Sequence, residues 1–319
     1  MAVRWSTQRR TRVGGDWPHP SGEQWVISAE GHRATIVQLG GGVRSYTVDG
    51  VPLLAGYPDS VLPRGGAGQV LAPWPNRLAD GKFMFRSETY QLPHNEPERS
   101  NAIHGLTRWL PWECSQRHDD SVTMECLLVP QPGYPWPLRL ATTWTVSTAG
   151  LRATHEVTNV GSDPCPFGLG VYPYVGVADA NLDQLLLQLP VTWRLIANDR
   201  QLPVSREQIV DTAYDFRSPA PIGELFLDAT FTGVRHGADG TARSRLFLPD
   251  GSRGVEVWQD AEFGWLQVYS GAGVTGHAGE VLAIAPMTCP PDAFNSHENL
   301  VILQAGQRWA GSWGIRPYA

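Results

Sequence analysis

Short apolar runs separated by closely spaced turn residues are the feature that most constrains the fold of this chain. Its 319 residues include 34 glycines and 26 prolines, scattered along the whole length rather than gathered in one segment. No stretch of twelve or more residues shows the 3.6-residue repeat of an amphipathic helix, while several runs alternate between apolar and polar side chains. Such a pattern favours short strands joined by tight turns.

The alternation is clearest over residues 138–147, where Trp144 and Val146 fall on the same face of the expected strand. Asp-Gly dipeptides at 49–50 and 250–251 stand between such runs and are typical of hairpin turns. The strands that these patterns predict cover residues 24–29, 34–39, 43–48, 51–54, 82–92, 138–147, 151–160, 182–189, 244–248, 254–259, 265–270, 281–287, 301–304 and 310–315.

A single domain is expected to account for residues 1–319. No linker, internal repeat or low-complexity tract divides the chain, and large β-sandwiches reach this size as one unit. The prediction is an all-β, antiparallel sandwich with long loops, in which residues 1–20 form a loosely attached N-terminal arm. Long loops on a rigid sheet are where functional side chains tend to lie.

The net charge and the cysteines indicate which partners, cofactors and cell compartment to expect for this protein. The net charge of −6 and the scattered basic residues give no reason to expect nucleic acid or an acidic membrane surface as a partner. No signal-peptide core or membrane-spanning run is found. The four cysteines lack metal-type spacing and predict reduced, mostly buried thiols of a cytoplasmic protein. No metal or organic cofactor is expected, and the oligomeric state stays open.

Five segments place side chains that can bind a ligand or transfer a proton in expected loops or at the ends of expected strands. An arginine can hold a sugar oxygen through its planar guanidinium, and a histidine followed by glycine suits a cleft where a proton is given or taken. Each segment is weak evidence alone, but the five in this order are specific. They are Pro73–Arg77, Asn101–Gly105, Phe167–Tyr174, Leu227–Phe231 and Ala283–Asn295.

From about Gly40 to the C-terminus, the chain resembles the aldose 1-epimerase (galactose mutarotase) family, in particular its bacterial members. The resemblance is carried by Asn76–Arg77, Ile103–Gly105, Asp228–Phe231 and Met287–Pro291. It implies a galactose-mutarotase-like β-supersandwich with a sugar cleft across one concave sheet.

The resemblance also implies roles for individual residues. Arg77 and His104 would bind and polarise the sugar, and Asp228 would accept hydrogen bonds from its hydroxyls. Asn76 and Tyr174 lie in the same motifs and are expected to contact the substrate. Trp74 is expected to provide a stacking wall for a sugar ring or an aromatic ligand.

Two positions depart from the family pattern. Tyr172 stands where the family has a histidine, the acid that protonates the ring oxygen, and Ala285 where it has the glutamate that takes the anomeric proton. A tyrosine with a pKa of about 10 is a reluctant acid near neutrality, and an alanine can do no proton chemistry. Glu280 lies at an odd offset from Ala285 and should face the other side of the strand. Because a positioned acid or base contributes about 10²–10⁴ in rate, mutarotation should be weak or lost.

Structural explanations compete for several of these side chains. Asp228 also suits a turn or a cap, and Tyr172 and Tyr174 also suit the core of a sandwich. Cys289 has no histidine or aspartate beside it in sequence and is better explained as a buried thiol. His155 shares a strand face with apolar residues and is expected in the core or on the sheet surface.

Three functions stay open at this point. The first is an aldose 1-epimerase-like protein that acts on or binds a carbohydrate or glycoside, with His104 and Tyr172 as its altered catalytic groups. The second is a repurposed enzyme of a specialised biosynthetic pathway, performing an isomerisation, cyclisation or elimination in the same cleft. The third is a non-catalytic sugar-binding or regulatory protein. We expect free space beside Ala285 and an aromatic wall at Tyr172, which would favour a sugar, a glycoside or a polar-headed aromatic ligand.

Overall fold

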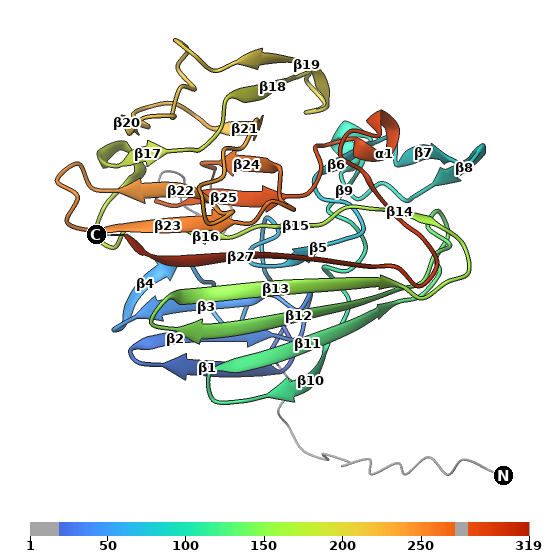
Figure 1. The fold of residues 1–319 in the computed structure, drawn as a ribbon, viewed down its shortest axis with the longest axis horizontal. Coiled ribbons are helices and arrows are strands. Elements are labelled where there is room, and N and C mark those ends of the chain that lie inside the picture. The colour runs from blue at the N-terminus through green and yellow to red at the C-terminus, as the bar shows by residue number, and fades with distance from the viewer. Residues whose placement is uncertain (1–18, 272–279, 319) are drawn as a thin grey trace.

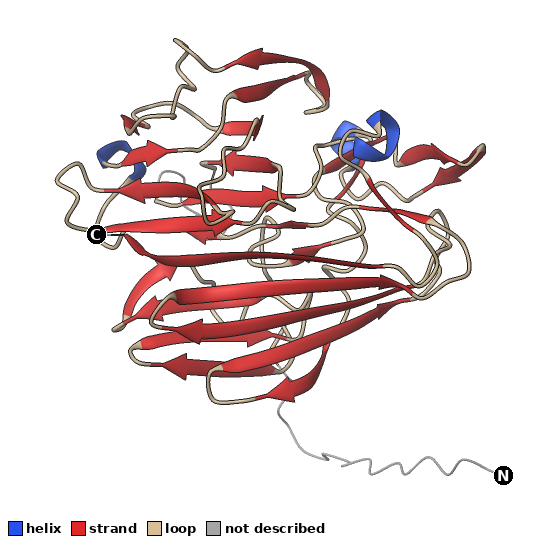
Figure 2. Ribbon diagram, in the orientation of Figure 1, coloured by secondary structure: helices blue, strands red, loops and turns tan. Residues whose placement is uncertain are grey.

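Strands make up most of the regular secondary structure (Figures 1 and 2). The alternation of the sequence reappears as alternating burial along these strands. The computed structural model describes residues 19–271 and 280–318. In β12 (Leu138–Ser147) and β13 (Gly150–Asn159), almost every second side chain is buried. The N-terminal arm expected at residues 1–20 lies, apart from its last two residues, outside the described residues.

Two large sheets contain most of the strands, and every strand pairing found in them is antiparallel. The first sheet has the order β1-β2-β3-β4-β16-β25-β24-β21-β18-β19, and β15 joins it by pairing with β25 and with β5. Its strands are β1 (Gln24–Ala29), β2 (His32–Val37), β3 (Val43–Val48), β4 (Val51–Leu54), β5 (Val70–Leu71), β15 (Gly170–Val171), β16 (Tyr174–Val175), β18 (Trp193–Ala197), β19 (Pro203–Gln208), β21 (Asp228–Thr232), β24 (Trp265–Tyr269) and β25 (Leu282–Met287).

The second sheet has the order β10-β11-β12-β13-β27-β23-β22-β17-β20. Besides β12 and β13, its strands are β10 (Glu113–Arg117), β11 (Ser121–Leu128), β17 (Leu186–Gln188), β20 (Ala220–Pro221), β22 (Ala242–Phe247), β23 (Gly254–Gln259) and β27 (Arg308–Tyr318). Three two-stranded ribbons and three short helical segments complete the described fold: β6 (Arg77–Ala79) with β9 (Asn101–Ile103), β7 (Lys82–Phe85) with β8 (Glu88–Gln91), β14 (Cys165–Phe167) with β26 (Val301–Leu303), η1 (Pro97–Arg99), η2 (Leu182–Gln184) and α1 (Ala293–Ser296).

The two sheets pack face to face, with β1 and β2 against β11, β12 and β13 (Figure 1). Trp144 of β12 and Trp313 of β27 meet edge to face at 5.9 Å between ring centroids. The Trp144 indole donates a hydrogen bond to the carbonyl of Gly41, which ties the two sheets together. His155 is completely buried between Thr142 and Trp313, hydrogen-bonded to both, as expected for a core histidine.

Most of the strands expected from the sequence are found within a few residues, and the differences have clear causes. Residues 82–92 form the hairpin β7–β8 rather than one strand, because Arg86 and Ser87 both adopt positive φ angles and reverse the chain. Residues 182–189 form the 3-10 turn η2 and the short strand β17 rather than one strand. Strands β10 and β19 were not expected, because both lie at sheet edges with mostly exposed side chains and lack the apolar alternation on which the prediction depended. Strands β11, β18 and β21 were missed as well, although the side chains of β11 alternate between buried and more exposed positions. None of the helical segments in the described part of the chain is long and apolar enough to cross a bilayer.

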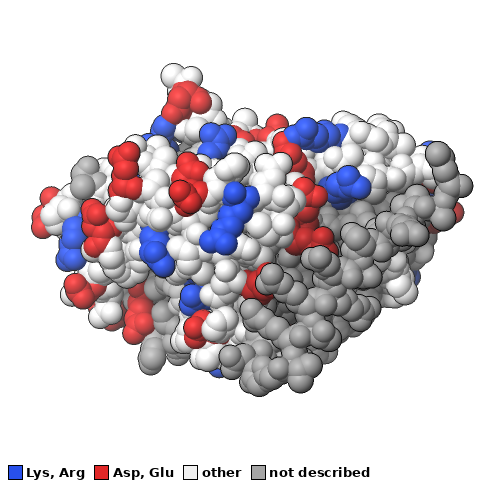
Figure 3. Space-filling view, turned by 90° about the horizontal axis from the view of Figure 1, so that it is seen from below, with Lys and Arg blue, Asp and Glu red and all other residues white. Residues whose placement is uncertain are grey.

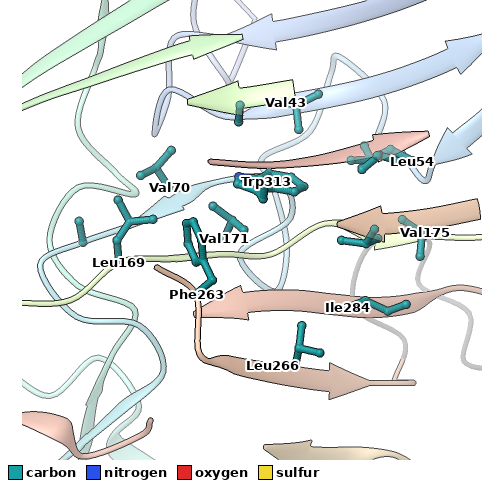
Figure 4. Close-up of a cluster of buried hydrophobic side chains, with 14 of the residues drawn as sticks. Val43, Leu54, Val70, Leu169, Val171, Val175, Phe263, Leu266, Ile284 and Trp313 are labelled. Atoms are coloured by element: carbon teal, nitrogen blue, oxygen red, sulfur yellow. The ribbon is translucent and has the colours of Figure 1, made fainter. Parts of the chain in front are cut away.

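The central strands β24 and β25 are buried on both faces. Leu266, Val268 and Ile284 point into the sandwich core, where Leu266 and Ile284 lie near Phe263 and Val171 (Figure 4). The intervening side chains, among them Gln267, point to the opposite face of the sheet. That opposite face carries the candidate site.

Removing a core side chain of β24 should therefore cost much more stability than removing an exposed side chain of the same type. Leu266→Ala should lower the free energy of unfolding by roughly 2–5 kcal/mol, because it leaves a cavity under the sheet. Leu127→Ala, at a position that is 53% exposed on β11, should change it by about 0.5 kcal/mol or less. Urea unfolding of both variants measures the difference, and equal losses would contradict the assignment of the core face.

Candidate functional site

The strand register brings polar and ionisable side chains onto the face of the first sheet that points away from the core. In one row across the sheet, Asp228 pairs with Tyr269, Tyr269 with Ala283, and Ala283 with Tyr174. Because side chains alternate along a strand, all four share a face. The neighbouring row places Thr230 beside Gln267 and Gln267 beside Ala285.

The same register brings together Tyr172 and Ala285, the two positions at which the resemblance implies replaced catalytic residues. Gly170 pairs with Met287 and Tyr174 pairs with Ala283, so Tyr172 lies opposite Ala285 between these two pairs. Both belong to one buried cluster on this face of the sheet. Residues more than a hundred positions apart in the sequence are thus direct neighbours.

A cavity of about 280 Å³ opens above these strands. Tyr269 of β24 and two arginines, Arg99 and Arg108, line it and were not singled out from the sequence. The remaining lining includes six of the residues that the sequence did single out: Asn76, Arg77, His104, Tyr172, Tyr174 and Asp228.

His104 is held by a reciprocal pair of hydrogen bonds with Asn76. The backbone N–H of His104 donates to the Asn76 carbonyl at 2.9 Å, and the backbone N–H of Asn76 donates to Nδ1 of His104 at 3.2 Å. Both residues have positive φ angles, and the following Gly105 packs so tightly that a Cβ there would lie 2.1 Å from the Ala72 carbonyl oxygen. This local geometry explains the His-Gly sequence.

The protonation state of His104 follows from these contacts. Burial lowers its pKa well below the usual 6.5, and the positive charges of Arg108 and Arg77 lower it further. Since Nδ1 accepts a hydrogen bond, the neutral ring carries its proton on Nε2. His104 therefore offers the cavity a hydrogen-bond donor without a positive charge.

Arg77 is fixed by Glu96. Its Nε and Nη2 donate to the two carboxylate oxygens at 2.9–3.1 Å, and Asn101 and Arg99 also donate to this carboxylate. Burial opposes the ionisation of Glu96, but these donors outweigh it and its pKa lies below the ordinary value. Within the described residues, Nη1 of Arg77 makes no hydrogen bond, so one edge of the guanidinium is left for a ligand.

Gln267 connects the sheet to the loop that carries Asn76. Its Oε1 accepts hydrogen bonds from Asn76 Nδ2 at 3.2 Å and from the Thr230 hydroxyl, while its Nε2 donates to Asp228 at 2.8 Å. The side chain is 3% exposed. The sequence analysis missed this residue, although its position between two apolar residues of a buried strand was a usable signal.

Asp228 supplies the only carboxylate among the described residues that line the cavity. Burial raises its pKa above the ordinary value, and Arg77 and the hydrogen bond from Gln267 offset this only in part. Burial also raises the pKa of the Tyr172 phenol well above 10, so this group is an even weaker acid than an exposed tyrosine.

Two expectations about the cavity are wrong. Ala285 is completely buried among Tyr172, Tyr174 and other apolar side chains, so the tyrosine rings fill the space that we expected to be open. Trp74 does not line the cavity. It is 3% exposed and packs in the core against Phe294, at 5.7 Å between ring centroids.

Cys289 and Glu280 stay outside the cavity lining. Cys289 is fully buried, and burial raises the pKa of its thiol to about 12, which fits a structural rather than a nucleophilic cysteine. In the part of the chain that the structure describes, no three His, Cys, Asp or Glu side chains gather closely enough to hold a metal ion.

Comparison with known proteins shows which family the chain belongs to. A sequence model of the family described as Aldose 1-epimerase matches residues 23–316. The chain belongs to this family. It is 31% identical over 290 residues to the uncharacterized protein YihR of Escherichia coli, covering 91% of each chain. It is 24% identical over 297 residues to the uncharacterized protein YphB of the same organism, covering 92% of this chain and 98% of YphB.

Solved structures of aldose 1-epimerase relatives share the fold. A putative aldose 1-epimerase from Escherichia coli superposes with a TM-score of 0.79 at 21% identity, over 93% of this chain and 99% of that one. The GalM/aldose epimerase homologue from Caenorhabditis elegans gives a TM-score of 0.80 at 19% identity, over 92% and 98% of the two chains. The all-β, galactose-mutarotase-like architecture expected from the sequence is thus confirmed.

The buried environment of His104 makes a prediction that spectroscopy can check. Its imidazole should stay neutral, with the proton on Nε2, through the pH range on either side of about 6.5 in which an ordinary histidine titrates, because burial and two nearby arginines lower its pKa. Nitrogen-15 NMR of labelled protein, with His104→Gln to assign the signal, reports the tautomer directly. Protonation with a midpoint near the unperturbed value of about 6.5 would contradict the site geometry.

Proposed function

We propose that this aldose 1-epimerase relative binds a pyranose sugar or a glycoside in the cavity, and that its mutarotase activity is weak. One observation carries the second half of the proposal: Tyr172 and Ala285 face each other in register, and Ala285 is fully enclosed. No carboxylate stands at the position to which the family resemblance assigns the base.

The polar lining supports sugar binding. His104 presents a neutral N–H donor, Arg77 a free guanidinium edge, and Asp228 a carboxylate acceptor. Tyr172 and Tyr174 add aromatic surface on the same side of the cavity, with 5.5 Å between their ring centroids. A few placed donors and acceptors beside aromatic walls are the combination with which proteins orient small polar ligands.

Mutarotation requires a base to take the proton from the anomeric hydroxyl and an acid to protonate the ring oxygen. Tyr172 cannot readily give up a proton, since burial raises its pKa well above 10. Loss of a positioned acid or base typically costs about 10²–10⁴ in rate. The remaining groups bind and polarise the sugar, but they do not replace both proton-transfer partners.

A second candidate function, a repurposed enzyme acting in the same cleft, is favoured by the state of Asp228. Burial raises the pKa of this carboxyl above its ordinary value, which is the direction in which enzymes tune a carboxyl that acts as an acid or a base. Asp228 and the neutral His104 line the same cavity. Such a pair could move a proton at another atom of a bound ligand, in an isomerisation or an elimination.

Anomer equilibration tests the main proposal. The wild-type protein should speed the equilibration of fresh α-glucose and α-galactose at least about 100-fold less than a competent member of the family, which is the lower limit for losing one proton-transfer group. Polarimetry measures the rate, and calorimetric titration of the same sugars verifies that the protein still binds them. A rapid, pH-dependent acceleration by the wild-type chain would contradict the proposal, and Asp228→Asn would then show which carboxylate acts.

Restoring the family residues should restore part of the rate. Tyr172→His with Ala285→Glu should raise the mutarotase rate about tenfold or more, short of the full 10²–10⁴ per group because the supporting contacts differ. Ala285→Glu alone should give no gain and a lower melting temperature, since the new carboxylate would be forced among the tyrosine rings. The idea fails if the double variant folds, binds sugar and is no faster than wild type.

A further inference from the structure

Arg108 differs from the other two arginines of the cavity. Arg77 and Arg99 both pair with Glu96, at 2.9 and 3.2 Å. Arg108 forms no ion pair with any residue that the structure describes, and its Nε is buried without a hydrogen-bond partner. Burial lowers the pKa of its guanidinium, so its charge is poorly solvated.

A partly buried cation without a counter-ion is costly unless an anion accompanies it. The lining of the cavity contains three arginines and one carboxylate, Asp228, and Glu96 is already shared by Arg77 and Arg99. The face of the molecule in Figure 3 shows a different arrangement, in which acidic and basic side chains are interspersed outside the grey residues. Since the whole chain has a net charge of −6, the excess of positive charge in the cavity lining is local.

Arg108 lies apart from Arg77 and Asp228, the side chains that are expected to bind sugar hydroxyls. Arg77 and Asp228 also line a narrow recess together with Gln267 and Thr230, and Arg108 does not reach that recess. Arg108 lies instead near Tyr174, whose phenol feels its positive charge. The Arg108 guanidinium also packs 4.8 Å from the ring centroid of Trp109, which helps to hold it in place.

We propose that Arg108 anchors an anionic group, a carboxylate, sulfonate or phosphate, carried by the sugar that the cavity binds. This inference rests on the proposed sugar-binding function. The planar guanidinium can meet such a group with two parallel hydrogen bonds from its terminal nitrogens, which unlike Nε are not enclosed by the protein. Arg77, His104 and Asp228 then hold the hydroxyls at the other end of the ligand.

Calorimetric titration with four sugars tests the proposal: glucose, glucuronate, glucose 6-phosphate and glucose 6-sulfate. At least one acidic sugar should bind wild-type protein tenfold or more tightly than glucose, and this preference should weaken as salt is raised. Arg108→Gln should remove the preference while leaving the affinity for glucose within about twofold. Arg108→Lys, which keeps the charge but loses the planar fork, should keep part of the preference.

Matched controls separate the possible outcomes. Arg86→Gln, at a side chain that is 61% exposed, should bind all four sugars like wild type, and melting curves verify that every variant is folded. If glucose binds as tightly as the acidic sugars, or if inorganic sulfate or phosphate alone binds as tightly as they do, this inference is wrong and the proposed function stands. If no sugar binds, both are wrong. An equal loss of all sugars in Arg108→Gln also overturns the assignment of an anion anchor.

Discussion

Strands β24 and β25 have both faces buried, and this constraint decides which side chains point into the core and which point into the site. One face packs into the sandwich through Leu266 and Ile284. The other face is covered by the tyrosine cluster and by the loop that carries His104. Because side chains alternate along a strand, neighbouring positions such as Leu266 and Gln267 serve different layers. A shift of one residue in the register would exchange the core for the site, so stability and site geometry are fixed by the same hydrogen bonds.

The hydrogen bonds of Gln267 connect the sheet to the loop that carries Asn76 and so fix the position of that loop. One buried amide satisfies Asn76, Thr230 and Asp228 at once. Asn76 in turn donates to Nδ1 of His104, which leaves the proton of the neutral ring on Nε2. The donors and acceptors of the cavity are therefore positioned before any ligand arrives, which reduces the entropy lost when a ligand binds.

The sequence predicted many of the strands whose two faces differ, although β11 was missed, and it predicted the cavity residues that stand in recognisable motifs. Strand β12 was located to the residue because its alternation is strict, whereas β10 and β19 escaped because edge strands with exposed side chains carry no such pattern. Arg108 escaped for another reason, because an arginine without a counter-ion is defined only by its tertiary neighbours. For Gln267 the sequence showed an amide between Leu266 and Val268, but its three hydrogen-bond partners come from distant segments. The expected role of Trp74 failed because an indole suits a sugar cleft and a core equally well.

The pairing of Tyr172 with Ala285 also limits the order in which such a site can change by single substitutions. A tyrosine introduced while a glutamate still occupies position 285 would crowd a closed cluster and leave a buried charge there, whereas an alanine introduced first leaves only a void that a larger neighbour can later fill. The sizes of the side chains at the two positions are thus coupled. If the two residues replaced a histidine and a glutamate, as the resemblance implies, the easiest order of change would pass through a protein that had already lost its base.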